Sequence, residues 1–313
     1  MNTKKVPKRR IKKSERPPLI FKVTEPTILM DFLLQNLPGK NRNNIKTLLN
    51  DGQIFVNSIR VSVYNHPLAA GQTVEMRWQK KTQTSGFQGI KIIHEDKHLI
   101  VIEKDAGVLS IATEKKNQTT AYNMLSAYVK KQGGNNKIFV VHRLDRDTSG
   151  IMMYARSQKM QEELQRNWHS MVLERTYLAV VSGIPEEPEG TITSYLKENK
   201  ALIMYSTQDA TVGHLAITHY KTLKHSQFYS LLKVNPKTGR KNQIRVHCTD
   251  MGHPIVGDKK YGSKANPINR LGLHAWVLSF IHPVSKEHMR FESFIPNKFS
   301  KLFPEKEKKE LQE

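Results

Sequence analysis

The chain has 313 residues, 38% hydrophobic and 25% charged, and its 50 Lys and Arg against 28 Asp and Glu give a net charge of +22. A field of this sign favours a polyanionic partner, either nucleic acid or an anionic membrane surface. No run approaches the roughly 20 apolar residues of a membrane span, and no secretory-type apolar segment lies near the start. The single cysteine, Cys248, excludes an internal disulfide and is typical of a reducing, cytoplasmic compartment.

The first segment is strongly basic. Residues 1–16 carry eight Lys or Arg against one Glu and lack apolar periodicity. We therefore predict that residues 1–21 form a disordered arm.

Residues 22–78 read as a module of two short helices followed by short strands. Thr27 is expected to cap the first helix, and the second is expected to end at Asp51-Gly52. The text from Asn43 to Asn57, Ile-Lys-x-Leu-Leu and then Gly-x-Ile-x-Val-Asn, resembles the RNA-binding domain of ribosomal protein S-four. The positions predicted to contact RNA, which an ordinary solvated face would also explain, are Lys40, Arg42, Lys46 and Arg60.

A polar linker, residues 79–89, is expected to lead into a second domain at residues 90–302, and residues 303–313 are expected to form a charged tail. The second domain opens with β-rich text and continues with a helix at 120–132. Ser157 can cap another helix carrying Met160, Leu164 and Trp168, a stripe interpreted as core.

The densest chemistry lies at residues 142–150, His-Arg-Leu-Asp-Arg-Asp-Thr-Ser-Gly, between apolar runs at 138–141 and 151–155 that read as buried strands. Each residue alone is typical of a turn whose side chains bond to nearby backbone. The whole string resembles the signature of the RluA-type (RluC- and RluD-like) RNA pseudouridine synthases. The resemblance implies that Asp145 is catalytic, that Arg143 fills the space vacated by a flipped base, and that His142 supports the loop.

Two further stretches resemble motifs of this family. Residues 174–183 resemble the second motif, which implies that Tyr177 lies against the target base. Residues 239–247 resemble the third, and we predict a strand there with Gln243, Arg245 and His247 on one face. The resemblance implies that Arg245 pairs with the catalytic aspartate, and Ile244 is counted with the substrate-binding residues.

The chain departs from the family pattern at two points: Lys241-Asn242 replaces Thr-His, and Asp105 replaces a proline. The family-like text at 252–262 and 273–283 is interpreted as structural turns and strands that shape the cleft.

Converting uridine into pseudouridine breaks a glycosidic bond and forms a carbon–carbon bond without gain or loss of atoms. Neither a metal nor a redox or nucleotide cofactor is therefore expected. The reaction needs an ionised carboxylate, which a neighbouring guanidinium favours. The target base must also leave its stack, and an aromatic face in the pocket would offset part of that cost.

The resemblance implies an α+β fold, with a mixed, mainly antiparallel sheet, flanking helices and a central cleft, joined to a small α+β RNA-binding domain. The expected function is isomerisation of uridines in structured RNA, with large-subunit ribosomal RNA favoured as the partner. Transfer RNA is an alternative substrate, and a non-catalytic RNA-binding assembly factor on the same fold is an alternative function. The protein is expected to be a cytoplasmic monomer that binds no membrane.

Overall fold

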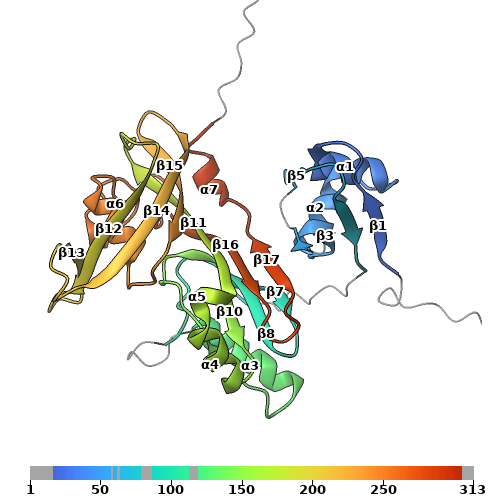
Figure 1. Ribbon diagram of the computed structural model, residues 1–313, viewed down its shortest axis with the longest axis horizontal. Helices are drawn as coiled ribbons and strands as arrows, with labels where there is room; N and C mark the ends of the chain where they lie inside the picture. Colours follow the sequence, from blue (N-terminus) through green and yellow to red (C-terminus); the bar gives the residue numbers. More distant parts are fainter. Residues whose placement is uncertain (1–16, 58, 62–63, 79–86, 113–118, 305–313) are drawn as a thin grey trace, which may run out of the picture. The chain divides into compact units, whose positions relative to one another are not determined.

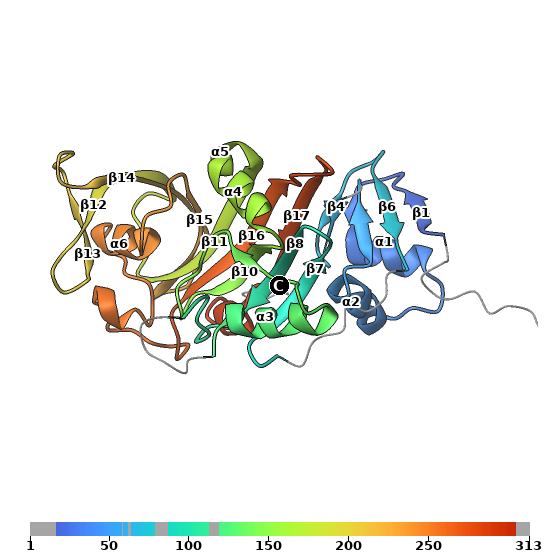
Figure 2. The ribbon, with the colours of Figure 1, turned by 90° about the horizontal axis from the view of Figure 1, so that it is seen from below.

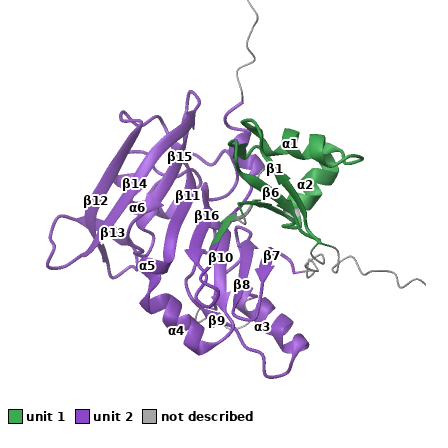
Figure 3. Ribbon diagram, turned by 45° about the vertical axis from the view of Figure 1, so that its right-hand side comes forward, with its two compact units in different colours: residues 1–86, 289–291 green, residues 87–288, 292–313 purple. Residues whose placement is uncertain are grey.

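The computed structural model describes residues 17–57, 59–61, 64–78, 87–112 and 119–304. The chain divides into two compact units: residues 1–86 with 289–291, and residues 87–288 with 292–313 (Figure 3). The predicted arm up to residue 16, most of the predicted linker and the predicted tail from residue 305 lie outside the described residues.

The first unit combines a four-stranded sheet, in the order β1-β6-β3-β4, with a two-stranded sheet of β2 and β5 and two helices. Its elements are β1 (Leu19–Lys22), β2 (Thr27–Ile28), α1 (Leu29–Asn36), α2 (Arg42–Asn50), β3 (Ile54–Val56), β4 (Ile59–Arg60), β5 (Pro67–Leu68) and β6 (Thr73–Met76). Leu29 and Leu33 in α1, like Ile45 and Leu49 in α2, are four residues apart and fully buried, because this spacing places them on one helix face. Residues 19–21 of β1 lie within the segment predicted to be disordered, and the strand is ordered by antiparallel pairing with β6.

The predicted cap at Thr27 is wrong. Thr27 belongs to β2 and pairs with Leu68, and α1 begins at Leu29 without a side-chain cap. The N–H groups of Leu29 and Met30 instead donate to the carbonyls of His66 and Tyr64, both at 2.9 Å. A neighbouring loop thus satisfies helix donors that a capping side chain normally satisfies.

The second unit is built, within the described residues, on an eleven-stranded sheet in the order β13-β12-β14-β15-β11-β16-β10-β8-β7, with β9 on β10 and β17 on β16 (Figure 1). The strands of this sheet are β7 (Ile90–Glu95), β8 (Leu99–Lys104), β9 (Phe139–Val140), β10 (Ser149–Ala155), β11 (Val172–Ser182), β12 (Glu189–Glu198), β13 (Met204–Thr207), β14 (His214–His225), β15 (Tyr229–Pro236), β16 (Leu273–Ile281) and β17 (His288–Glu292), of which residues 289–291 are counted with the first unit. The helices of the second unit are α3 (Ala121–Gln132), α4 (Gln158–Arg166), α5 (Trp168–Met171), α6 (Gln243–Asp250), α7 (Asn297–Ser300) and the 3₁₀ helix η2 (Lys259–Tyr261). Most neighbours are antiparallel, whereas β10 and β16 are parallel, and the predicted α+β class with a mixed sheet and flanking helices is confirmed.

Strand β10 is buried along its whole length because helices cover both of its faces. Figure 2 shows α3 on one side of this part of the sheet and α4 with α5 on the other. Met152 and Tyr154 share a core with Leu125 and Val129 of α3, as the alternation of a strand requires. The run before the central motif is less regular than predicted, since β9 is a half-buried two-residue strand.

Gly150 is where β10 meets β16. It pairs with Ala275 in the parallel register and has φ +117°, and a Cβ there would lie 2.1 Å from the carbonyl oxygen of Ala275. Only glycine fits so close an approach in this conformation. The turn before β10 is therefore anchored against β16.

The strand predicted at 239–247 is wrong, because Gln243 to Asp250 form helix α6. Ile244 and Cys248, one helical turn apart, both pack in the cluster that contains Ala179 of β11. The β-branched residues at 244 and 246 imitate strand alternation, but packing against the sheet selects the helical period. Consequently Gln243, Arg245 and His247 do not form one strand face.

Candidate active site

The turn of residues 142–150 is held in place by hydrogen bonds between the backbone of Leu144 and the side chain of Ser110. The buried hydroxyl of Ser110 donates to the carbonyl of Leu144 at 2.6 Å and accepts the Leu144 N–H at 3.2 Å. One residue further on, the N–H of Thr148 donates to the carbonyl of Asp145 at 3.2 Å and closes the turn. The carboxylate of Asp145 is thereby held out from a rigid backbone.

Lys104 ties the same turn to the end of β8. Its side chain is fully buried, and its ammonium donates to the carbonyls of Asp105, Val108 and Arg146 at 3.0, 2.7 and 3.0 Å. Burial lowers the pKa of Lys104 to about 8. Asp105 stands where the family pattern has a proline. The turn is held instead by the hydrogen bonds of the preceding residue, Lys104.

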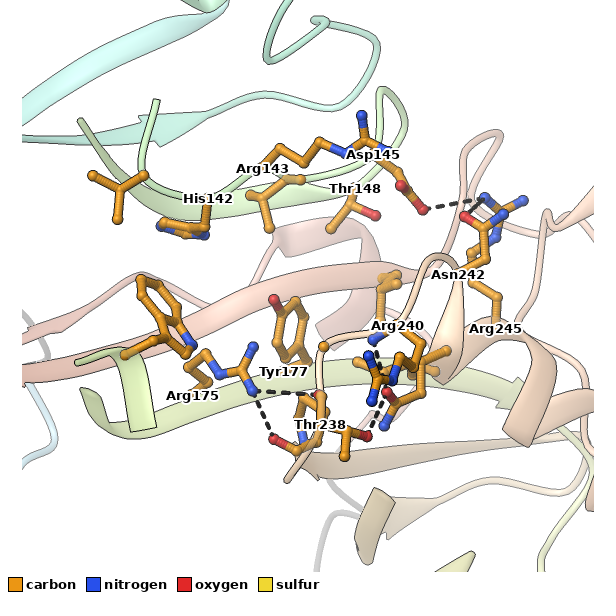
Figure 4. Close-up of a pocket in the computed structure, with 18 of the residues that line it drawn as sticks. His142, Arg143, Asp145, Thr148, Arg175, Tyr177, Thr238, Arg240, Asn242 and Arg245 are labelled. Carbon is orange, nitrogen blue, oxygen red and sulfur yellow. Dashed lines mark hydrogen bonds and ion pairs between the residues drawn. The ribbon is translucent and has the colours of Figure 1, made fainter. Parts of the chain in front are cut away.

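The turn overhangs a cavity of about 490 Å³ (Figure 4). Every residue of the second unit for which sequence predicted a catalytic or substrate-binding role lines this cavity: His142, Arg143, Asp145, Tyr177, Ile244 and Arg245. They come from the turn, from β11 and from α6, so the fold gathers positions that are more than a hundred residues apart in the sequence. Four arginines also line it, Arg143, Arg175, Arg240 and Arg245, against the one carboxylate of Asp145, which favours an anionic ligand.

Arg245 joins two carboxylates. Its Nη1 lies 3.3 Å from Oδ2 of Asp145, and its Nε and Nη2 donate to the two oxygens of Asp258 at 2.7 Å each. Burial opposes the charge on the guanidinium, but the hydrogen bonds and charge of Asp258, with a smaller contribution from Asp145, raise the pKa of Arg245. Arg245 is thus a permanent cation beside Asp145.

Asp258 is a site residue that the sequence analysis missed, because it lies in text interpreted as a structural turn. Its side chain is 1% exposed, and it accepts both hydrogen bonds that orient Arg245. The signal for it was a carboxylate two residues after the buried pair Ile255-Val256, since a buried charge needs a cationic partner.

Tyr177 lies on β11 in the wall of the cavity, between Arg175 and Arg240 in the view of Figure 4. Burial raises the pKa of its phenol, and the charge of Arg175 only partly opposes this. The hydroxyl is therefore protonated at neutral pH, and the ring presents an aromatic surface to the cavity.

His142 is held as a neutral support. Its Nε2 accepts the N–H of Met153 at 3.1 Å, and burial together with the charge of Arg175 lowers its pKa to about 3. Its ring centroid lies 5.1 Å from that of Trp168. Arg143 beside it is exposed and has no hydrogen-bond or ion-pair partner within the described part of the chain.

The interpretation of Trp168 as a core residue is wrong. A break at Asn167 ends α4, and Trp168 begins α5 and lines the cavity instead of continuing the stripe of Met160 and Leu164. Arg175, which the sequence analysis also missed, lies 5.7 Å from the Trp168 ring and donates to the carbonyls of Pro236 and Thr238. Its position two residues before Tyr177 on a strand, hence on the same face, was the available signal.

Lys241 and Asn242, which depart from the family pattern in the third motif, also have defined contacts. Lys241 forms an ion pair with Glu198. Asn242, in the left-handed conformation with φ 55°, accepts from Arg245 at 3.2 Å and donates to the hydroxyl of Tyr261 at 2.9 Å. Asn242 therefore adds a second restraint on the arginine that faces Asp145.

The predicted RNA-contact residues of the first unit lie around its second helix and β4. Lys40 is exposed just before α2, and Arg42, at the start of α2, lies 3.5 Å from Asp31. The ammonium of Lys46 lies 5.3 Å from the centre of the Tyr64 ring, and Arg60 ends β4.

No helix in the described ranges is long and apolar enough to cross a membrane. Among the same residues, no group of three or more His, Cys, Asp or Glu is arranged to hold a metal ion.

The chain belongs to the RNA pseudouridine synthase family. The model of the RNA pseudouridylate synthase family matches residues 98–250. A Bacillus subtilis protein named "Uncharacterized RNA pseudouridine synthase YlyB" is 31% identical over 87% of this chain and 91% of its own length. The "Ribosomal large subunit pseudouridine synthase D" of Nitrosomonas europaea is 34% identical over 68% of this chain and 64% of its own length.

The fold is likewise that of solved relatives. The structure of human RNA pseudouridylate synthase domain containing 4 matches with a TM-score of 0.56 at 23% identity, over 67% of this chain and 92% of that chain. Its membership of this family makes the protein an RNA pseudouridine synthase, the class that the resemblance at residues 142–150 implied.

Proposed function

We propose that the protein isomerises specific uridines of large-subunit ribosomal RNA, with Asp145 as the nucleophile. The observation that carries the chemical part is the approach of Arg245 to Asp145, at 3.3 Å, on the wall of a cavity that also presents Tyr177. The choice of ribosomal RNA is supported by relatives in Nitrosomonas europaea and Neisseria meningitidis that bear the name "Ribosomal large subunit pseudouridine synthase D".

The uridine enters the cavity with its base against Tyr177 and its sugar–base junction at Asp145. The carboxylate is 35% exposed and lies against Arg245, so it is oriented and accessible to substrate. It attacks the base ring or the anomeric carbon, or promotes elimination to a glycal. The bond from the sugar to N1 breaks, the base turns, and a bond from the sugar to C5 forms while C5 loses a proton and N1 gains one.

Arg143 and Tyr177 would offset the cost of taking the base out of its stack. Removing a base from structured RNA costs a few kcal/mol. The exposed and unpaired Arg143 is free to enter the space that the base leaves, within the described part of the chain. The Tyr177 ring supplies a replacement stacking surface inside the cavity.

The first unit would add affinity through contacts with phosphates. Its exposed Lys40 and Arg42 lie at the start of α2, and Lys46 lies one turn further along that helix. Such contacts neutralise backbone charge without reading sequence. On this proposal residues 22–78 are an RNA-binding domain of the S-four type.

The test uses cells that lack the gene, complemented with wild type, Asp145→Asn or Asp209→Asn. Pseudouridines in total RNA are mapped by carbodiimide modification and primer extension. We expect sites in large-subunit ribosomal RNA to be lost without the gene and restored by wild type and by Asp209→Asn, whose carboxylate lies in an exposed turn. Asp145→Asn should restore none of them, because an amide cannot act as the nucleophile.

Sites restored by Asp145→Asn would refute the nucleophile. Sites lost only from transfer RNA would redirect the substrate, and no lost site with RNA binding retained would favour the non-catalytic alternative.

A further inference from the structure

We infer that a second cavity, on the far side of Asp145 from Tyr177, is a phosphate-binding channel for the RNA strand that carries the target uridine. This cavity has a volume of about 800 Å³. It shares Asp145, Asn242 and Arg245 with the first cavity, the one that contains Tyr177. Figure 4 shows these three side chains together at one end of the first cavity. The two cavities therefore adjoin at the reacting group.

The chemistry dictates what must lie there, and this step depends on the proposed function. The bond that breaks joins base to sugar, so a base against Tyr177 with its junction at Asp145 places the ribose and its phosphates beyond Asp145. The second cavity begins at Asp145, so a strand that leaves the first cavity past Asp145 would run through it.

The charge of the second cavity suits such a strand. Six cations line it against three carboxylates: Arg146, Lys241, Arg245, Lys259, Lys260 and Arg270 against Asp145, Asp147 and Asp258. Asp258 binds Arg245, and Asp147 accepts from Arg146 at 3.1 and 3.2 Å, so these two pairs cancel and leave four cations against Asp145. The balance that faces a ligand is positive.

Lys259 is the lysine best placed to bind a phosphate. Lys241 forms its ion pair with Glu198, and Lys260 donates to the carbonyl of Leu202 at 2.8 Å. Lys259 is exposed at the start of η2 and has no such partner within the described residues. Its ammonium is thus uncompensated in a channel that leads from Asp145.

The experiment measures binding by fluorescence anisotropy of an oligocytidylate with one central uridine, which fixes the register of the strand. Full-length wild type, Lys259→Gln and Lys130→Gln are compared across a range of salt concentrations. Lys130 is an exposed lysine on α3 that lines neither cavity, so its variant controls for net charge. In a second arm, each phosphate beside the uridine is replaced in turn by an uncharged methylphosphonate.

We expect Lys259→Gln to bind the oligonucleotide roughly fivefold more weakly than Lys130→Gln, with a salt slope lower by about 0.7, the value for one phosphate contact on a single strand. One methylphosphonate should weaken wild-type binding by a similar factor and leave Lys259→Gln almost unaffected, because the two changes remove the same contact.

Equal affinities and slopes for Lys259→Gln and Lys130→Gln would overturn the inference. So would failure of the wild type to bind this strand, or methylphosphonate losses of equal size in both proteins. The readout is equilibrium binding and requires no turnover. A failure of Asp145 as the nucleophile would therefore appear in the mapping experiment and leave this result unchanged.

Discussion

Replacing Asp258 by asparagine tests whether this buried carboxylate holds Arg245 in position. The substitution keeps the size of the side chain and removes its charge. In the native protein, the two oxygens accept from Nε and Nη2 of Arg245 at 2.7 Å, and Oδ1 also accepts the N–H of Tyr261 at 3.2 Å. An amide can accept at one oxygen only, so its NH₂ group would face an N–H of Arg245.

The expected cost follows from these contacts. A hydrogen bond to a charged group contributes about 1.5–3 kcal/mol, and removing one partner of a buried pair costs about 3–5 kcal/mol. Arg245 retains Asp145 and is 14% exposed, which reduces the penalty. We expect the free energy of unfolding to fall by about 3 kcal/mol, which for a unit of this size lowers Tm by roughly 6–12 °C.

The assays are urea unfolding and single-turnover pseudouridine formation. The single-turnover rate should fall roughly ten- to hundredfold, because a displaced guanidinium no longer orients Asp145. Glu186→Gln is the control and should change stability by less than about 0.5 kcal/mol, because this exposed carboxylate has no hydrogen-bond or ion-pair partner among the described residues. A loss below about 1 kcal/mol with an unchanged rate would show that Asp258 does not position Arg245.

Three further predictions concern other parts of the second unit. Tyr177→Phe keeps the ring and removes the hydroxyl, so we expect turnover within about tenfold of wild type; a loss above a thousandfold would assign acid–base chemistry to the phenol. Gly150→Ala should destabilise by about 3 kcal/mol or more, because its Cβ would overlap the backbone of Ala275, whereas Gly134→Ala, with nothing within 4 Å of its Cβ, should be neutral in the same melts. Burial lowers the pKa of His274 to about 3 from its ordinary 6.5. Between these two pH values the unfolded state binds more protons than the folded state, so the free energy of unfolding decreases as the pH is lowered below 6.5. Lowering the pH from 7 to 5 should reduce the free energy of unfolding by about 2 kcal/mol through this histidine. The reduction should therefore be about 2 kcal/mol smaller in His274→Gln than in wild type, and an equal reduction in both proteins would contradict the lowered pKa of His274.

The sequence determined the parts of this protein that depend on local pattern. The string at residues 142–150 located the turn that carries Asp145, and the motif around Tyr177 located the strand across the cavity. Alternating and helical periods also predicted α3 and the two helices of the first unit, because the apolar residues of these helices are buried on one face.

Tertiary structure decided what local pattern leaves ambiguous. Ile244 and Val246 fit a strand as well as a helix, and packing of Ile244 and Cys248 against the sheet selected α6. A break at Asn167 turned Trp168 from the core into the cavity wall.

The pairing of charges was likewise invisible to periodicity. Asp145, Arg245 and Asp258 are separated by 100 and 13 residues, and their ion pairs exist only because the turn, α6 and the loop before η2 converge. A buried charge demands a partner, but the chain alone does not say which one. Sequence therefore pointed to Asp145, which we propose as the nucleophile, and the fold supplied the groups that orient its carboxylate and the second cavity beside it.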